Sequence, residues 1–211
     1  MAKPASVKAV SFGAISLSML PRVYEPAEDS FLLATYASSL SGSILEIGCG
    51  CGIVSLSAAQ ANPKNSVQGV DINPQAVKCA EENARANGIK NATFLLSDLF
   101  SDIPPLQKFD FILFNPPYLP TTREERLLSP EENAAYDGGA SGLNVSKKFI
   151  MAAPAHLKKG GRVAVVATSL GNGIEKTLAL LESHVGKAEI LAQESFFFEK
   201  IALIEAKRGQ K

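Results

Sequence analysis

The stretch that decides the fold is residues 109–118, FDFILFNPPY. It begins as a nearly continuous apolar run, which is typical of a strand that is buried on both faces of a sheet. It ends at two prolines, which donate no backbone N–H, so no regular strand or helix continues through them. Pro116 also favours an extended backbone at Asn115. The stretch therefore predicts a central strand with an asparagine at its tip and an aromatic residue, Tyr118, just beyond it.

An asparagine in this position can bind a planar NH2 group. Such a group has two N–H donors, and the side-chain oxygen of Asn115 and a nearby main-chain carbonyl can each accept one of them. Tyr118 would cover the flat face of the group, and the nitrogen would keep one lobe free to attack. Residues 115–118, NPPY, are also compatible with a plain strand end followed by a proline turn. Their meaning depends on what precedes them in the chain.

Strand and helix patterns alternate along most of the chain. We expect strands at residues 43–48, 66–71, 92–96, 109–114 and 162–168, helices at residues 52–61, 74–87, 143–157 and 174–183, and a closing antiparallel pair at residues 188–197 and 199–206. This alternation predicts an α/β fold in which helices cover both faces of a doubly wound parallel sheet.

The beginning of the chain predicts less regular structure. Residues 1–23 indicate one or two short strands. Pro26 marks the start of a helix that ends near Gly42, and Glu28 and Asp29 lie near its positive end. We expect a single domain over residues 1–211, with a short N-terminal extension over residues 1–25.

A glycine-rich turn follows the first long strand. Residues 46–52, EIGCGCG, contain three alternating glycines, so that the backbone can turn sharply and a ligand can lie against Gly48 and Gly50. Asp71 ends the next strand, 23 residues after Gly48. An acid in that position accepts hydrogen bonds from ribose hydroxyls in doubly wound nucleotide-binding folds. The pattern therefore predicts a nucleoside site.

The spacing of the glycines bears on which nucleotide binds there. Dinucleotide-binding folds use G-x-G-x-x-G, in which the third glycine admits a pyrophosphate, whereas this chain has G-x-G-x-G with Glu46 just before it. An acid so close to the ligand favours a cationic or zwitterionic group, and S-adenosylmethionine has an amino group, a sulfonium and no phosphate. Asp98, after the third strand, is suited to accept from the adenine amine, or else caps a turn.

Composition limits the other classes of function. Lys plus Arg equals Asp plus Glu at 21 each, and zero net charge argues against broad electrostatic binding to nucleic acid. Cys49, Cys51 and Cys79 are an odd number, which argues against a disulfide framework, and too few histidines accompany them for a metal site or for His-dependent nucleophilic catalysis. No apolar run has the length of a membrane span or of a signal peptide, so we expect a cytoplasmic protein.

Together, the glycine-rich turn, Asp71, Asp98 and residues 115–118 resemble class I S-adenosylmethionine-dependent methyltransferases that act on a planar nitrogen. Residues 23–30, VYEPAEDS, followed by LEIG at 45–48 and NPPY at 115–118, are similar to the HemK-like glutamine methyltransferases of class 1 release factors. The short chain resembles the archaeal and eukaryotic branch of that family. This resemblance implies a seven-stranded sheet in the order 3-2-1-4-5-7-6 with the last strand antiparallel.

The resemblance also implies the roles of individual residues. Asn115 and Pro116 would hold the target amide and Tyr118 would flank it, so these are the expected catalytic residues. Cofactor binding is expected from these positions, with Gly50 added from the glycine pattern: Ser30, Glu46, Gly48, Gly50, Asp71, Asp98, Leu99 and Asn115.

Similar archaeal and eukaryotic enzymes bind a small zinc-binding activator protein, which implies a partner at the open edge of the third strand, residues 92–96. Phe94, Leu96, Leu99 and Phe100 would give that edge its apolar character, unless they face inward under a helix. Three alternatives remain for the function. The NPPY motif is shared with enzymes that methylate an exocyclic amine of DNA or RNA, a protein lysine is another acceptor, and a nucleoside-binding protein with an inactive site would need no acceptor.

Overall fold

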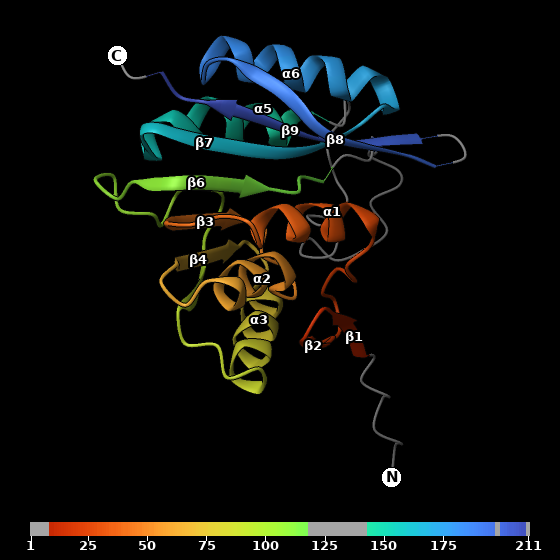
Figure 1. Ribbon diagram of the computed structural model, residues 1–211, viewed down its shortest axis with the longest axis vertical. Helices are drawn as coiled ribbons and strands as arrows, with labels where there is room; N and C mark the ends of the chain where they lie inside the picture. The colour runs from red at the N-terminus through yellow and green to blue at the C-terminus, as the bar shows by residue number, and fades with distance from the viewer. Residues whose placement is uncertain (1–8, 118–142, 197–198, 210–211) are drawn as a thin grey trace.

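Figure 1 shows a computed structural model of the chain, which describes residues 9–117, 143–196 and 199–209. Seven strands form one sheet in the order β5-β4-β3-β6-β7-β9-β8. The strands are β3 (Ser43–Ile47), β4 (Ser66–Asp71), β5 (Ala92–Leu96), β6 (Phe109–Phe114), β7 (Leu157–Thr168), β8 (Ala188–Phe196) and β9 (Glu199–Lys207). β9 pairs antiparallel with β7 and β8, whereas the pairs from β5 to β7 are parallel. The predicted fold class and sheet order are confirmed.

Helices cover both faces of this sheet. Those on one face are α1 (Glu28–Ala37), α2 (Ile53–Ala61) and α3 (Pro74–Ala86), and those on the other are α5 (Asn144–Ala152) and α6 (Gly173–His184). In β6, Leu113 joins the core beneath the first group, whereas Ile112 and Phe114 join the core beneath the second. β6 therefore has a packed layer on each side, as its apolar sequence predicts.

The predicted helix over residues 143–157 is wrong in its second half. α5 ends at Ala152, and a 3-10 turn, η1 (Ala153–His156), follows it. Pro154 lies in that turn, and a proline has no N–H with which to continue α-helical hydrogen bonding. β7 begins at Leu157 instead of residue 162, because Leu157 pairs with Phe109 ahead of an irregularity between β6 and β7.

The helix after Pro26 is also shorter than predicted. α1 begins at Glu28 and ends at Ala37, well before Gly42. The remaining predicted elements agree with the observed bounds to within one residue at each end. A second 3-10 turn, η2 (Leu170–Asn172), connects β7 to α6. The single-domain prediction is not decided by these elements and remains a prediction.

The N-terminal extension forms a hairpin that is held by α3. β1 (Ala9–Phe12) and β2 (Ile15–Ser18) pair antiparallel, which confirms the predicted short strands. The Ser18 N–H donates to Asn83 Oδ1 at 2.8 Å, and the Ser16 N–H donates to Asn87 Oδ1 at 3.0 Å. Both amide groups donate in return to the carbonyls of the same serines. Two asparagines of α3 thus satisfy the backbone of β2 as a neighbouring strand would.

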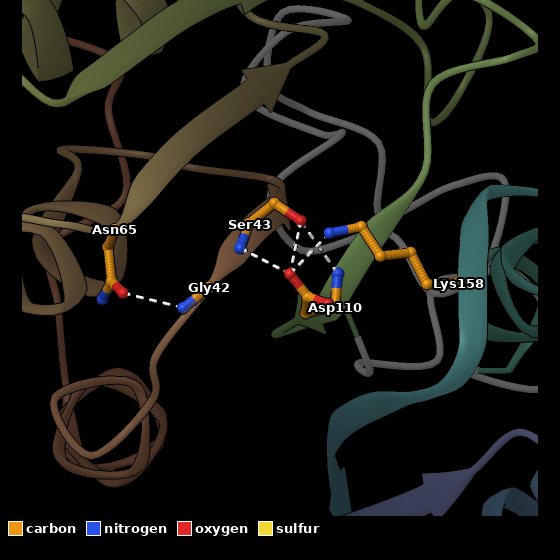
Figure 2. A network of polar contacts seen from close by, with 5 residues as sticks. All are labelled: Gly42, Ser43, Asn65, Asp110 and Lys158. Carbon is orange, nitrogen blue, oxygen red and sulfur yellow. Dashed lines mark hydrogen bonds and ion pairs between the residues drawn. The ribbon is translucent and has the colours of Figure 1, made fainter.

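A polar network joins the amino ends of the two central strands (Figure 2). Asp110 Oδ2, in β6, accepts from the Ser43 N–H at 2.8 Å and from the Ser43 hydroxyl at 2.7 Å. Lys158 Nζ donates to the same oxygen at 2.8 Å, and nearby the Gly42 N–H donates to Asn65 Oδ1. The network holds β3 and β6 in one register, so that their carboxyl ends lie side by side at the other end of the two strands.

Within the described ranges, no helix is long and apolar enough to cross a membrane. The same ranges contain no group of three or more His, Cys, Asp or Glu side chains that could hold a metal ion. The three cysteines are buried as free thiols.

Candidate active site

The carboxyl ends of β3, β4, β5 and β6 lie at the same end of the sheet, because these strands pair in parallel. Figure 1 shows this for β3, β4 and β6. Most of the predicted site residues lie at or just after these strand ends: Glu46, Gly48, Gly50, Asp71, Asp98, Leu99, Asn115 and Pro116. Ser30 comes from the first turn of α1 and reaches Asn115. Tyr118 lies outside the described residues. The topology therefore gathers side chains from distant parts of the sequence at one place.

The glycine-rich turn is shaped by residues with positive φ. Gly48, Gly50 and Gly52 have φ values of 69°, 53° and 88°, which L side chains rarely adopt. A Cβ added at Gly50 would meet no atom within 4 Å, so this part of the turn borders open space. A ligand can therefore lie directly against the backbone there.

Asp71 is held against this turn. The Gly50 N–H donates to Asp71 Oδ2 at 2.9 Å, and the Asn73 N–H donates to Asp71 Oδ1 at 2.9 Å. Burial raises the pKa of Asp71, although these backbone hydrogen bonds oppose the rise. The aspartate therefore connects the end of β4 to the turn after β3, in addition to its predicted role toward a ribose.

Glu46 is almost fully buried in β3, with 3% of its surface exposed. Its Oε2 accepts from the Ser55 N–H at 2.9 Å and from the Ser55 hydroxyl. Burial raises the pKa of Glu46 to about 8, despite the hydrogen bonds from Ser55. The sequence predicted a charged acid next to the ligand, whereas the raised pKa leaves Glu46 mostly protonated at neutral pH in the ligand-free protein.

Asp98 and Leu99 form the loop after β5. The Asp98 side chain is exposed, and its main-chain oxygen accepts from the Ser101 N–H at 3.0 Å and the Ser101 hydroxyl at 2.8 Å. Leu99 has a φ of 51°, and its carbonyl accepts from the Ser97 hydroxyl at 3.0 Å. The turn is thus stabilised by main-chain groups, which leaves the Asp98 carboxylate available to a ligand.

Asn115 has the arrangement expected of an amide-binding residue. Its Nδ2 lies 3.5 Å from the Ser30 hydroxyl oxygen, to which it donates. Its Oδ1 is buried and has no hydrogen-bond partner in the described structure. Pro116, which follows it, is buried as well. A buried acceptor without a partner is uncommon and favours a ligand that donates to it.

Two polar residues at this site were not identified from the sequence. Ser55 is buried in α2 and holds Glu46. Asp29 was interpreted as an acid near the helix end, but it is 2% exposed and accepts from Ser30 and Tyr24. The signal that could have revealed Asp29 is the adjacent serine and the nearby tyrosine, which can both donate to a carboxylate.

Comparison with known proteins identifies the family. The model of the methyltransferase small domain matches residues 28–129. A putative protein N5-glutamine methyltransferase of Methanocaldococcus jannaschii is 45% identical over 195 residues, which cover 92% of this chain and 96% of the relative. This chain belongs to the protein N5-glutamine methyltransferase family. It is thus a methyltransferase, and its methyl donor is S-adenosylmethionine, as the sequence predicts.

Two further relatives support this assignment. The methyltransferase HEMK2 of Mus musculus is 36% identical over 180 residues, which cover 82% of this chain and 83% of the relative. The release factor glutamine methyltransferase of Geobacter sulfurreducens is 32% identical over 182 residues, which cover 83% of this chain and 62% of the relative.

Solved structures share the fold. The 16S rRNA N2 G1207 methyltransferase RsmC of T. thermophilus, in complex with AdoMet and guanosine, has a TM-score of 0.73 at 24% identity, covering 97% of this chain and 51% of that one. The Mtq2-Trm112 complex of E. cuniculi is described as responsible for methylation of the eRF1 translation termination factor. Its Mtq2 chain has a TM-score of 0.66 at 22% identity, covering 89% of this chain and 99% of that one.

Proposed function

We propose that this enzyme methylates the side-chain amide of a glutamine in a class 1 peptide chain release factor. The observation that carries the proposal is the buried, unpartnered Oδ1 of Asn115 at the end of β6, because it is suited to accept an N–H from a planar amide. The family, and the release factor named for two of the similar proteins, support the choice of substrate. Release factors act in translation, which would place the enzyme in the cytoplasm.

The cofactor would lie across the ends of β3, β4 and β5. Gly50 would give it open backbone and Gly48 is exposed beside it, although a Cβ at Gly48 would contact Phe114. Asp71, held against this turn, would accept from a ribose hydroxyl, and Glu46 would become ionised beside a cationic group. The other proposed contacts are Ser30, Asp98, Leu99 and Asn115. When bound, S-adenosylmethionine supplies a methyl group, which the amide nitrogen takes up as the carbon–sulfur bond breaks and a proton leaves to water.

The contribution of the protein is to orient the amide. An amide nitrogen is a poor nucleophile because its lone pair is delocalised into the carbonyl. Asn115 Oδ1 and the Pro116 carbonyl would each accept one N–H, which draws electron density onto the nitrogen and fixes its direction of approach. Positioning of this kind would account for most of the gain in the rate of methyl transfer, and no side chain needs to act as a strong base before the transfer.

Asn115→Ala tests this arrangement. We expect the rate of methyl transfer to a release factor to fall by about a hundredfold or more, the size found when one positioned polar group is removed. Affinity for the cofactor, measured by isothermal titration, should change much less. Gln193→Ala, which removes an exposed amide on β8, is the matched control and should transfer at the wild-type rate. Near-normal turnover of Asn115→Ala on every substrate tried would exclude the amide-binding role.

We also propose that a small activator protein binds the edge strand β5. The described sheet ends at β5, and Leu96 there is 52% exposed, which supports strand addition at this edge. Phe94 and Leu99 are partly buried. Phe100 does not contribute to this edge, because it is buried and stacks on Phe149 and His156. A zinc-binding activator is the partner that the resemblance implies.

Gel filtration after co-expression with such an activator tests the partner. We expect a complex, and Leu96→Asp should weaken it by about tenfold or more, because a charge would enter an apolar contact. Ile190→Asp is the matched control, since Ile190 is 42% exposed on β8 at the opposite edge. A lone wild-type chain with full activity and no complex would contradict the proposal.

The second candidate is methylation of an exocyclic amine in RNA. It is favoured by the fold shared with RsmC, which was solved with guanosine, and by Asn115, because an exocyclic amine is also a planar NH2 group. The zero net charge favours a protein substrate instead. Parallel transfer assays on a release factor and on ribosomal RNA separate the two, and an assay on a protein lysine covers the third acceptor.

A further inference from the structure

A series of hydrogen-bonded polar side chains leads from Tyr24, near the start of the VYEPAEDS segment (residues 23–30), into the amide site. The Tyr24 hydroxyl lies 3.3 Å from Asp29 Oδ2, to which it donates. Asp29 Oδ1 accepts from the Ser30 N–H at 2.6 Å and from the Ser30 hydroxyl at 3.1 Å. The Ser30 oxygen then accepts from Asn115 Nδ2 at 3.5 Å. Asp29, Ser30 and the Asn115 oxygen are all buried.

The number of available protons fixes which group donates and which accepts in this series of hydrogen bonds. A serine hydroxyl has one proton, and that of Ser30 is donated to Asp29, so the Ser30 oxygen is left as an acceptor toward Asn115. The amide of Asn115 can donate to Ser30 only through its nitrogen. The opposite end of the amide, Oδ1, must then face the substrate. The 3.5 Å separation is long, and such contacts commonly shorten when substrate binds.

We propose that Asp29 is a positioning residue that sets the orientation of the Asn115 amide, acting through Ser30. Without Asp29, the Ser30 hydroxyl is free to donate to Asn115 Oδ1, and the amide then turns over and presents its NH2 group to the substrate. The NH2 groups of the turned Asn115 and of a substrate glutamine cannot form a hydrogen bond with each other. The carboxylate of a glutamate, in contrast, could accept from the turned Asn115 NH2 group. Asp29 therefore makes the site selective for a glutamine amide over a glutamate carboxylate.

The inference rests on the proposed role of Asn115 in holding a glutamine amide. Asp29→Ala tests it, with Glu28→Ala as the matched control, because Glu28 is an exposed acid in the same first turn of α1. Both changes remove one negative charge from that helix end, but only the first removes the acceptor of the Ser30 proton. We expect kcat to fall by about tenfold or more in Asp29→Ala, with cofactor affinity within about threefold of wild type.

The second readout is selectivity, which a purely structural role of Asp29 would not alter. The wild-type enzyme should bind a release factor with its target glutamine replaced by glutamate about tenfold more weakly than the natural one, measured as a competitive inhibitor. Asp29→Ala should lose that preference, whereas Asp29→Asn, which keeps an acceptor oxygen, should retain part of it. If Asp29→Ala does not fold, Asp29→Asn is compared with the wild type instead, and we expect a smaller loss of the same preference.

The outcomes separate this inference from the proposed function. A wild-type enzyme that transfers no methyl group to the release factor overturns the proposed function. An active wild-type enzyme with unchanged kcat and unchanged selectivity in a folded Asp29→Ala or Asp29→Asn variant overturns the positioning role alone. Loss of selectivity in Asp29→Ala but not in Glu28→Ala supports it.

Discussion

The carboxyl of Glu46 is buried beside Ser55, and burial raises its pKa from a usual 4.5 to about 8. At neutral pH the free protein therefore holds a proton on this group. The amino or sulfonium cation of the cofactor, bound nearby, would favour the ionised form. We expect affinity for S-adenosylmethionine to rise between about pH 6 and about pH 8, with a proton released on binding at neutral pH. Titration calorimetry in two buffers of different ionisation enthalpy measures this release.

The same group determines how stability depends on pH. Because its pKa is higher in the folded protein than in the unfolded chain, the folded form binds more protons between pH 4.5 and about 8. The stability of the ligand-free protein should therefore decrease as pH rises through that window, and the raised pKa of Asp71 acts in the same direction. Glu46→Gln should flatten both pH profiles. Cofactor binding without proton release in the wild type would contradict the ionisation of Glu46 on binding.

At this scale the sequence predicted which residue types lie at the strand ends but not which way every side chain points. Asn115 and Asp71 end buried strands, so topology alone brings them to the edge. Asp29 and Glu28 are neighbours in one helical turn, and only the phase of the helix decides which of them is buried. Asp29 lies on the buried face of α1 with Leu33 and Ala37, and the packing of that face against the core sets the phase.

At the scale of elements, the network around Asp110 holds β3 and β6 together at their amino ends, on the side of the sheet away from the site. Hydrogen bonds from Lys158 and Ser43 outweigh the effect of partial burial and lower the pKa of Asp110. Asp110→Ala removes acceptors from the Ser43 N–H and hydroxyl. We expect it to reduce the free energy of unfolding by about 1–2 kcal/mol in urea denaturation at neutral pH, with little change in cofactor affinity.

Lys158→Ala separates the ion pair from the strand contacts. The Lys158 side chain is 46% exposed and that of Asp110 is 36% exposed, so the pair should contribute less than about 1 kcal/mol. The stabilisation from Asp110 should be present above its usual pKa and be lost as pH falls, because its pKa is lowered in the folded protein. An equal loss of stability in both variants would contradict the dominance of the Ser43 contacts.

Element boundaries were predictable where periodicity and turn residues agree. The bounds of β4, β5 and β6 match the sequence pattern, since glycine, asparagine or proline residues lie near their ends. The region around Pro154 was not predictable from its apolar content, because the same residues suit a helix or a strand. There the pairing of Leu157 with Phe109, a contact distant in the sequence, lengthens β7.

At the scale of the whole molecule, the alternation of strands and helices predicted the parallel sheet, whereas the strand order came from the family resemblance. The hairpin β1–β2 was anticipated only as short strands, because its place is set by the amides of Asn83 and Asn87 on α3. Strands alone do not reveal such side-chain contacts. The substrate likewise comes from the family and from Asn115 together, since the fold is shared with enzymes that act on RNA.

The most direct test of the account is to locate the transferred methyl group. The purified enzyme, with its activator if one is required, is incubated with S-adenosylmethionine and a class 1 release factor, and the product is digested for mass spectrometry. We predict one methyl group on the side chain of a single glutamine, and no transfer when that glutamine is replaced. A methyl group on RNA or on a lysine, with the release factor glutamine unmodified, would contradict the account.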